Sequence, residues 1–314
     1  MESQSNISKA IFGALGYSTQ QVVDIPQGES NRVYKVKTNN GFILFRAPKS
    51  RKESHIEKLV WVEKALTKQS IPHAKLLYAT ADSTLFAYGF SIFEYIENTS
   101  SRDAILSGKT TLEEFHTELG QLLQNVHAIT FPAFGNIPLV LENSNDDFVV
   151  YNSKEVQRIL SKVEGLETDF PKNIAPLVCA KLETLHSLKP KLKPVLCHTD
   201  PAPNNCVWNE QMGTVLIDWD DARATSWVAD LADLTYSGSH LNELGPREER
   251  RKRILTSFLD GHGLGDFSYN EVLQVEHIMH ILKAVHHLPY YHEEQHNLEW
   301  FWKTKNRLLE LLEM

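Results

Sequence analysis

The sequence contains few cysteines and no long apolar run, and each absence excludes a class of protein. Its three cysteines, Cys179, Cys197 and Cys206, are an odd number without a Cys-x-x-Cys pair, which disfavours a disulfide-stapled secreted domain. No stretch of about 18 apolar residues is present to span a membrane, and the N-terminus lacks the basic region and apolar core of a secretory signal. We therefore expect a cytoplasmic protein with reduced thiols and no membrane partner.

The composition is that of an ordinary folded protein. Hydrophobic residues make up 42% and charged residues 23% of the 314 positions, which argues against a long disordered or fibrous segment. A chain of this length exceeds the size at which single hydrophobic cores usually stop growing. We therefore expect two lobes within one chain.

The N-terminal part of the sequence predicts a small antiparallel sheet with one helix. A helix is expected over residues 51–69, where apolar side chains recur at helical spacing up to Ser70. The turn Asn39-Asn40-Gly41 is a hairpin signal between two of the predicted strands. The strand-like segments are residues 21–27, 31–38, 42–48, 75–80 and 86–96.

The remainder of the chain is predicted to be mostly helical. Residues 111–129 begin with a capping-box pattern, Thr111 followed by Glu114, and carry apolar residues along one side. The polar stretch of residues 97–101 has the composition of a hinge. We therefore predict an α+β fold with a nucleotide-binding lobe at residues 1–97 and a larger helical, catalytic and substrate-binding lobe at residues 98–314.

Charge is divided unevenly between these two parts. Residues 1–97 contain 12 Lys+Arg and 9 Asp+Glu, a net charge of +3, whereas residues 98–314 contain 20 and 31, a net charge of −11. A mildly basic part suits a polyanion such as a nucleoside triphosphate, and an acidic part attracts a cationic co-substrate. Solvated surfaces explain the same charges equally well. The imbalance argues against nucleic acid as a partner, and the oligomeric state is left open.

The chemically informative segment is residues 195–222, VLCHTDPAPNNCVWNEQMGTVLIDWDDA. Its pattern predicts a strand, a loop, two strands joined by a turn, and a second loop that begins at Asp218. His198, Asp200 and Asn205 lie in the first loop. Polar side chains are thereby presented at the ends of strands.

These residue types suit phosphoryl transfer. That reaction needs a carboxylate to hold the attacking hydroxyl group and oxygen ligands to keep Mg²⁺ on the phosphates. Asp200 can orient the hydroxyl group and accept its proton. Asn205 and Asp218 can supply the one or two protein oxygens that Mg²⁺ prefers. The alternative is an ordinary loop with internally satisfied polar groups.

The spacing His-x-Asp-x-x-x-x-Asn is that of the protein-kinase catalytic loop, and the segment resembles the superfamily of aminoglycoside phosphotransferases and choline kinases. The resemblance implies a two-lobed, protein-kinase-like fold and a small-molecule kinase that uses ATP and Mg²⁺. It also implies that His198 holds the loop in shape, and that Asp230 supports the loop without touching substrate. Thr199 departs from the usual His-Gly-Asp. The matching residues are Cys197-His198-Thr199-Asp200, Asn205, Ile217-Asp218-Trp219-Asp220 and Asp230-Leu231-Ala232.

Weaker likenesses extend into the first lobe. Gly28, Ser30 and Asn31 resemble a nucleotide loop in which backbone amides approach phosphate, although a hairpin turn explains them too. Arg46 resembles the basic strand residue that touches the α- and β-phosphates, and Arg can bind phosphate through two N–H groups.

Further assignments follow from the resemblance. Glu57 or Glu63 would pair with Arg46 from the following helix, and Glu57 is favoured because it lies in an earlier turn. The adenine of ATP would hydrogen-bond to the main chain of Glu94, Tyr95 and Ile96.

The acceptor is expected to be a small molecule with a hydroxyl group. ATP would bind between the lobes, and the acceptor would lie against the acidic lobe near Asp220, Asp221 and the C-terminal helices. A cationic amino sugar or amino alcohol fits that charge. Charge alone does not decide among an antibiotic, choline, thiamine and a neutral sugar, nor between ATP and GTP.

Alternatives from other classes remain open. His292 and His296 belong to His-Glu-Glu-Gln-His, a formal match to the zinc-hydrolase motif HExxH, although a chain with 14 histidines can match it by chance. A non-catalytic nucleotide-binding relative is disfavoured because Asp200, Asn205 and Asp218 are all present. An ordinary protein kinase is disfavoured because the glycine-rich loop and Asp-Phe-Gly are missing.

Overall fold

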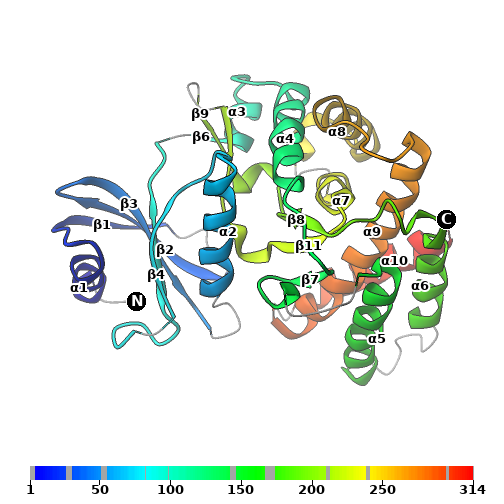
Figure 1. Cartoon of the computed structure of the whole chain (residues 1–314), viewed down its shortest axis with the longest axis horizontal. Helices are drawn as coiled ribbons and strands as arrows, with labels where there is room; N and C mark the ends of the chain where they lie inside the picture. The colour runs from blue at the N-terminus through cyan, green and yellow to red at the C-terminus, as the bar shows by residue number, and fades with distance from the viewer. Residues whose placement is uncertain are drawn as a thin grey trace. The chain divides into compact units, whose positions relative to one another are not determined.

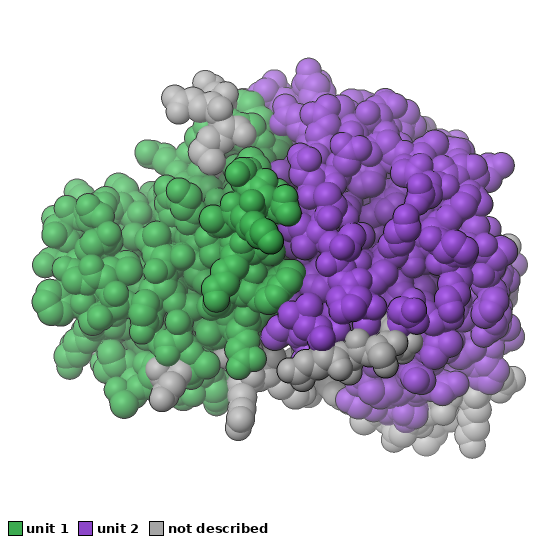
Figure 2. Space-filling view, in the orientation of Figure 1, with its two compact units in different colours: residues 1–104, 203–222 green, residues 105–202, 223–314 purple. Residues whose placement is uncertain are grey.

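The computed structural model of the chain forms two compact units, coloured green and purple in Figure 2. Unit 1 comprises residues 1–104 and 203–222, and unit 2 comprises residues 105–202 and 223–314. The boundary predicted from the sequence, at residue 97, had instead assigned residues 203–222 to the second lobe. The structure describes residues 4–25, 30–50, 55–81, 83–97, 99–141, 146–166, 174–209, 213–237, 241–294 and 297–313.

Unit 1 is built on a five-stranded antiparallel sheet with the order β1-β2-β3-β5-β4 (Figure 1). The predicted hairpin is present, and it turns at Gly41, whose φ of 104° is accessible to glycine without strain. All five predicted strands are found. They are β1 (Thr19–Ile25), β2 (Asn31–Thr38), β3 (Gly41–Pro48), β4 (Leu76–Thr80) and β5 (Phe90–Glu94).

The core of unit 1 joins the sheet to a helix that the sequence reading did not predict. This helix is α1 (Gln4–Leu15), labelled beside the sheet in Figure 1. It buries Ile7 and Ile11 in one cluster with Phe45 and its neighbours on the sheet. Ile7 and Ile11 are four residues apart, so they lie on one helical face. The predicted helix after β3 is α2 (Ile56–Lys68).

The later segment of unit 1 is the chemically informative run. It contains two short 3₁₀ turns, η3 (Pro203–Asn205) and η4 (Trp219–Asp221), and the strands β9 (Cys206–Asn209) and β10 (Gly213–Leu216). β9 pairs with β10 and with β6 (Thr99–Ser100), which is followed by α3 (Ser101–Leu106). The predicted strand–turn–strand arrangement is therefore present.

Unit 2 is mostly helical, as predicted. The capping box of its first long helix forms, because the Thr111 hydroxyl accepts a hydrogen bond from the Glu114 N–H at 3.1 Å and the Glu114 carboxylate accepts one from the Thr111 N–H at 2.9 Å. The helices are α4 (Leu112–His127), α5 (Phe148–Leu166), α6 (Ile174–Glu183), α7 (Val228–Ser237), α8 (Arg247–His262), α9 (Tyr269–Pro289), the π-helix η7 (Tyr290–Glu294) and α10 (Leu298–Glu313).

Unit 2 also contains a close contact between α4 and α8 and a small three-stranded sheet. Gly120 on α4 and Gly261 on α8 lie where the helices touch, and a Cβ atom at either position would collide with the backbone of the other helix. The sheet has the order β7-β11-β8. Its strands are β7 (Gly135–Asn136), β8 (Val195–Cys197) and β11 (Arg223–Thr225). Among the described residues, no helix is long and apolar enough to cross a bilayer.

Candidate active site

The loop after β8 carries His198, Thr199 and Asp200, and its backbone is fixed by a buried carboxylate. Asp230, on α7, is 0% exposed. Its Oδ2 accepts a hydrogen bond from the His198 N–H at 3.0 Å, and its Oδ1 accepts one from the Thr199 N–H at 2.6 Å. The Asp200 N–H donates to Nδ1 of the buried His198 ring at 3.4 Å. Unit 2 thus holds a half-buried Asp200 on a loop with two direct anchors.

Thr199 adopts a backbone conformation that normally favours glycine. Its φ is 65°, and a β-branched residue in this left-handed region costs on the order of 1–3 kcal/mol. This geometry explains why glycine suits the position, and the short bond to Asp230 is one of the contacts that hold threonine there. Asp218 is also left-handed, with a φ of 64°. Backbone strain therefore accompanies both predicted loops.

The buried Arg46, near the end of β3, forms ion pairs with two carboxylates of unit 1. Its Nη2 lies 2.9 Å from Oδ1 of Asp218 and 2.7 Å from Oδ2 of Asp220. Burial alone would lower the pKa of Arg46, but the charges of Asp220 and Asp218 outweigh that effect and raise the pKa. Arg46 is therefore a permanent cation facing an acidic pair.

Asp220 is the centre of this cluster. Besides Arg46, its Oδ2 accepts a hydrogen bond from Nδ2 of the buried Asn31 at 2.8 Å, and its backbone carbonyl accepts one from Nζ of Lys58 at 2.5 Å. Its Oδ1 is buried and has no hydrogen-bond partner among the described residues. The sequence had placed Asp220 with Asp221 in the acidic lobe as a substrate contact. The structure instead places Asp220 in unit 1 with the residues predicted to bind nucleotide, because η4 lies against α2, while Asp221 is exposed.

The predicted ion pair between Arg46 and a glutamate of α2 is not formed. Glu57 is exposed, and Glu63 instead accepts hydrogen bonds from the N–H of Leu76 and from Thr67. The inward-facing charged residue of α2 is Lys58, which is 9% exposed. Sequence reading missed it, although Lys58 lies four residues before the buried Val62 and hence on the same helical face.

The predicted metal ligands lie at adjoining parts of unit 1. The carbonyl group of Asn205, in η3, accepts a hydrogen bond from the N–H of Ile217 at 2.9 Å, and Asp218 is the next residue along the chain. Asn205 is half-buried, and the Asp218 side chain is 47% exposed. The backbone of Asn205 is therefore bonded to the residue that precedes Asp218, which places both residues near the end of β10.

The nucleotide roles of Gly28, Ser30 and Asn31 stay predictions. Gly28 lies outside the described residues. Ser30 is exposed, and its carbonyl group accepts a hydrogen bond from the Lys49 N–H at 3.0 Å. The side-chain amide of Asn31 donates to Asp220, which identifies it as a support of the acidic pair. No contact in the structure tests a phosphate role for these residues.

The segment expected to meet adenine begins at the end of β5. The N–H group of Glu94 donates to the Lys75 carbonyl at 2.9 Å, so it is engaged within the unit. The ring of Tyr95 lies 3.9 Å from the Lys35 ammonium, and Ile96 is half-buried. Tyr95 and Ile96 stay the predicted adenine contacts.

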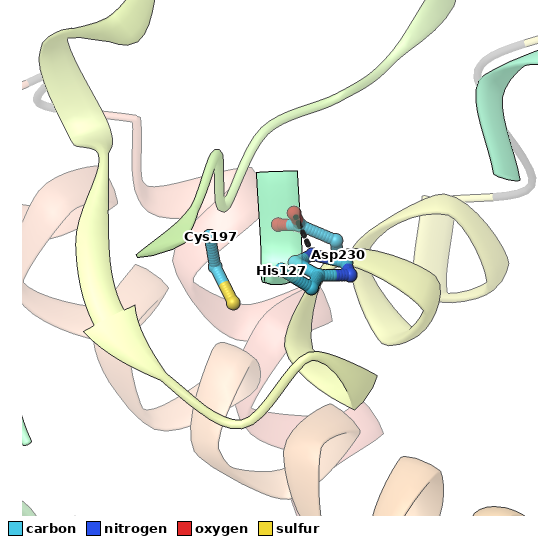
Figure 3. A group of neighbouring side chains, drawn as sticks. All are labelled: His127, Cys197 and Asp230. Atoms are coloured by element: carbon cyan, nitrogen blue, oxygen red, sulfur yellow. Dashed lines mark hydrogen bonds and ion pairs between the residues drawn. The ribbon is translucent and has the colours of Figure 1, made fainter. Parts of the chain in front are cut away.

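The histidines of the HExxH match are not both placed. His292 lies in η7 with its ring packed edge-on against Phe301, at a centroid distance of 5.2 Å, whereas His296 is outside the described residues. Within the described ranges, the one group of three potential metal ligands is His127, Cys197 and Asp230, all buried (Figure 3). Hydrogen bonds already engage their ligand atoms, since Nε2 of His127 lies 3.0 Å from Asp230 and the Cys197 thiol donates to the carbonyl groups of Thr225 and Ser226.

Comparisons with known proteins agree with this architecture. The structure of aminoglycoside phosphotransferase APH(4)-Ia superposes with a TM-score of 0.72 at 12% identity, covering 99% of both chains. Choline kinase LicA from Streptococcus pneumoniae gives 0.65 at 18% identity, covering 98% of both. The streptomycin-ATP-APH(2")-IIa ternary complex gives 0.65 at 15% identity, covering 99% of this chain and 97% of the other.

At these identities the solved structures establish a shared fold. A search of curated proteins found no match. The model of the family described as "Phosphotransferase enzyme family" matches residues 21–265, which include β8, the acidic pair and α7. The chain therefore belongs to the phosphotransferase enzyme family, as the resemblance of its loops had predicted.

Proposed function

We propose that this protein is a kinase that transfers the γ-phosphate of Mg²⁺-bound ATP to a hydroxyl group of a small molecule. The observation that carries the proposal is the support of Asp200: the loop that bears this half-buried carboxylate is anchored on both sides of Thr199 by the buried Asp230 and by His198. A carboxylate held in this way can orient an attacking hydroxyl group at little entropic cost.

Asp200 is assigned the role of orienting the acceptor hydroxyl group and taking its proton. Because phosphoryl transfer is largely dissociative, the proton moves late and positioning dominates. His198 keeps its ring buried and accepts the Asp200 N–H through Nδ1, so it holds the loop. Asp230 acts through the backbone and need not touch substrate.

The donor set of unit 1 fits a magnesium ion. Asp218 and Asn205 offer the oxygen ligands that Mg²⁺ prefers, and the buried Oδ1 of Asp220, without a hydrogen-bond partner among the described residues, offers a further oxygen nearby. When bound, Mg²⁺ would neutralise charge on the phosphates of ATP. Arg46 has five N–H donors, so it can bind a phosphate while Nη2 stays on the acidic pair.

The acceptor class is proposed from charge and from the relatives. Unit 2, residues 105–202 and 223–314, contains 19 Lys+Arg and 26 Asp+Glu, a net charge of −7, which suits a cation. One structural neighbour is a complex with streptomycin and ATP, and another is a choline kinase. These similarities support an aminoglycoside-like or amino-alcohol acceptor, with cytoplasmic location and nucleotide preference kept as predictions.

The test is ADP release by the purified chain with Mg²⁺-ATP or Mg²⁺-GTP and a panel of aminoglycosides, choline, ethanolamine, thiamine and sugars. One acceptor should stimulate release, and Asp200→Asn should reduce the stimulated rate by about 10²–10⁴-fold. The matched control is Asp266→Asn, which removes an exposed carboxylate paired with Lys193 and should leave the rate unchanged. Failure to bind either nucleotide would overturn the proposal, as would full activity of Asp200→Asn.

A further inference from the structure

Three buried side chains, Asp230, His127 and His262, form a chain of polar contacts next to the Asp200 loop. The proposed phosphotransfer mechanism gives no role to His127 or His262. Nε2 of His127, on α4, lies 3.0 Å from Oδ2 of Asp230, as the dashed line in Figure 3 shows. Nδ1 of His127 lies 2.8 Å from Nε2 of His262, on α8. Nδ1 of His262 lies 3.0 Å from the Gly263 carbonyl oxygen. The two rings therefore bridge a carboxylate and a carbonyl group.

Counting protons along this chain of contacts fixes its charge. A carbonyl oxygen only accepts, so Nδ1 of His262 must carry a proton. A carboxylate also accepts, so Nε2 of His127 must carry one. The contact between the two rings needs exactly one more proton to be a hydrogen bond. The two rings hold three protons in total, one more than two neutral imidazoles.

A second argument places the extra charge on His127. Asp230 is 0% exposed and accepts the N–H groups of His198, Thr199 and His127, a pattern that keeps a carboxylate ionised. Burial alone would raise the pKa of Asp230, but the hydrogen bond and charge of His127, followed by His198 and the Thr199 N–H, together outweigh it and the pKa is lowered. A buried anion of this kind needs a cation beside it.

The other titratable groups around Asp230 cannot supply that cation. Nδ1 of His198 accepts the Asp200 N–H, so this ring is neutral. The Cys197 thiol donates to the carbonyl oxygens of Thr225 and Ser226, and burial raises its pKa, so it is neutral as well. Burial, with the neighbouring charge of His127, lowers the pKa of His262 to about 3.

We propose that His127 is a buried imidazolium held between Asp230 and His262, and that His127 and His262 are positioning residues for the Asp200 loop. Packing supports the geometry, because the His262 ring stacks on Trp227 at 4.3 Å and on Phe258 at 5.3 Å, which fixes the direction of Nε2. His262 thereby holds His127, His127 holds Asp230, and Asp230 holds the backbone of His198 and Thr199. The positioning role rests on the proposed function, whereas the charge of His127 does not.

The charge is tested by long-range ¹H–¹⁵N spectra of the ring nitrogens in the full ¹⁵N-labelled chain near neutral pH. The exposed His186 supplies reference shifts for both protonation states on titration. Both nitrogens of His127 should be of the protonated type, and His262 should be protonated at Nδ1 alone. An unprotonated nitrogen on His127 would overturn the proposal. So would a shift of the His127 signals on adding Zn²⁺, which would indicate a metal site with Cys197 and Asp230 instead.

Two variants of His262 separate positioning from packing. His262→Phe keeps a ring between Trp227 and Phe258 but removes the acceptor, whereas His262→Gln offers a side-chain oxygen that can accept the His127 N–H. With an acceptor from the ADP-release screen, His262→Phe should lower kcat about ten- to a hundredfold with the KM for nucleotide unchanged, and His262→Gln should restore much of the loss. Equal kcat in the two variants would refute the positioning role. If no acceptor is found, the spectra of the unaltered chain still decide the charge.

Discussion

The two carboxylates that face Arg46 differ in exposure, and this difference predicts unequal contributions to stability. The Arg46 side chain is 7% exposed, that of Asp220 is 13% exposed, and that of Asp218 is 47% exposed. Removing one partner of a buried ion pair costs about 3–5 kcal/mol, because the other charge is left uncompensated. Exposed pairs contribute about 1 kcal/mol or less.

Asp220→Asn should therefore destabilise the protein by about 2–4 kcal/mol, below the full buried value because Asp218 still faces Arg46. Asp218→Asn should cost about 1 kcal/mol or less, since water already reaches this carboxylate. Both changes preserve side-chain shape, so the comparison isolates charge. Urea unfolding followed by circular dichroism gives the two values, with the exposed Asp24→Asn on β1 as a charge control near zero.

A double-mutant cycle with Arg46→Met sharpens the comparison. The coupling energy between Arg46 and Asp220 should exceed that between Arg46 and Asp218, because solvent screens the second pair. If Asp218→Asn proves as costly as Asp220→Asn, or if its coupling to Arg46 is the larger one, the reasoning from burial is refuted.

Three further predictions concern packing, capping and pH. Gly261→Ala should destabilise the protein by about 1–3 kcal/mol, because its Cβ would collide with the Thr117 carbonyl. The control is Gly13→Ala on α1, which has nothing within 4 Å and should stabilise the protein by about 0.5–1 kcal/mol. Equal thermal unfolding midpoints for the two variants would contradict the packing of α4 on α8. Thr111→Ala should cost about 1 kcal/mol in urea unfolding through loss of the α4 cap, and an unchanged midpoint would argue against the capping box. The stability that comes from rings with a pKa lowered to about 4 or 3 should be complete above about pH 6.5. It should fall by up to about 1.4 kcal/mol per pH unit for each such ring as the pH drops toward about 4, because the unfolded chain then binds protons that the folded rings do not. An unfolding free energy that stays flat over this range would refute the prediction. The rings whose pKa is lowered as far as about 4 or 3, with burial as the largest cause, are His116, His262, His280 and His286.

Structural features that depend only on residues close together in the sequence could be predicted. The strands around residues 195–222, the hairpin at Gly41 and the cap at Thr111 each depend on neighbouring residues, and local pattern is enough to find them. The family resemblance rests on the same kind of local spacing. The helix α1 was equally local, and its apolar residues at positions 7 and 11 were a usable signal.

The cluster around Asp220 could not be predicted in the same way. Arg46 and Asp220 are 174 positions apart in the sequence, and no local pattern pairs a strand-end arginine with one of several acidic residues. The likeness to kinases suggested a glutamate of α2, but the interior of that helix face carries Lys58. Likewise, His127 and His262 are single histidines on separate helices, and only the fold places their rings 2.8 Å apart.

The discontinuity of unit 1 has a consequence for how the chain is made. Arg46, Asn31 and Lys58 leave the ribosome early, but their partner Asp220 belongs to the stretch 203–222 that follows residues 105–202 of the other unit. Until that stretch is synthesised, Arg46 on the sheet lacks the carboxylates of Asp218 and Asp220 that it pairs with in the finished protein. Contacts of such long sequence separation also close slowly. A gene fragment that ends at residue 104 would therefore encode an incomplete unit, and adding residues 203–222 as a separate peptide supplies what it lacks.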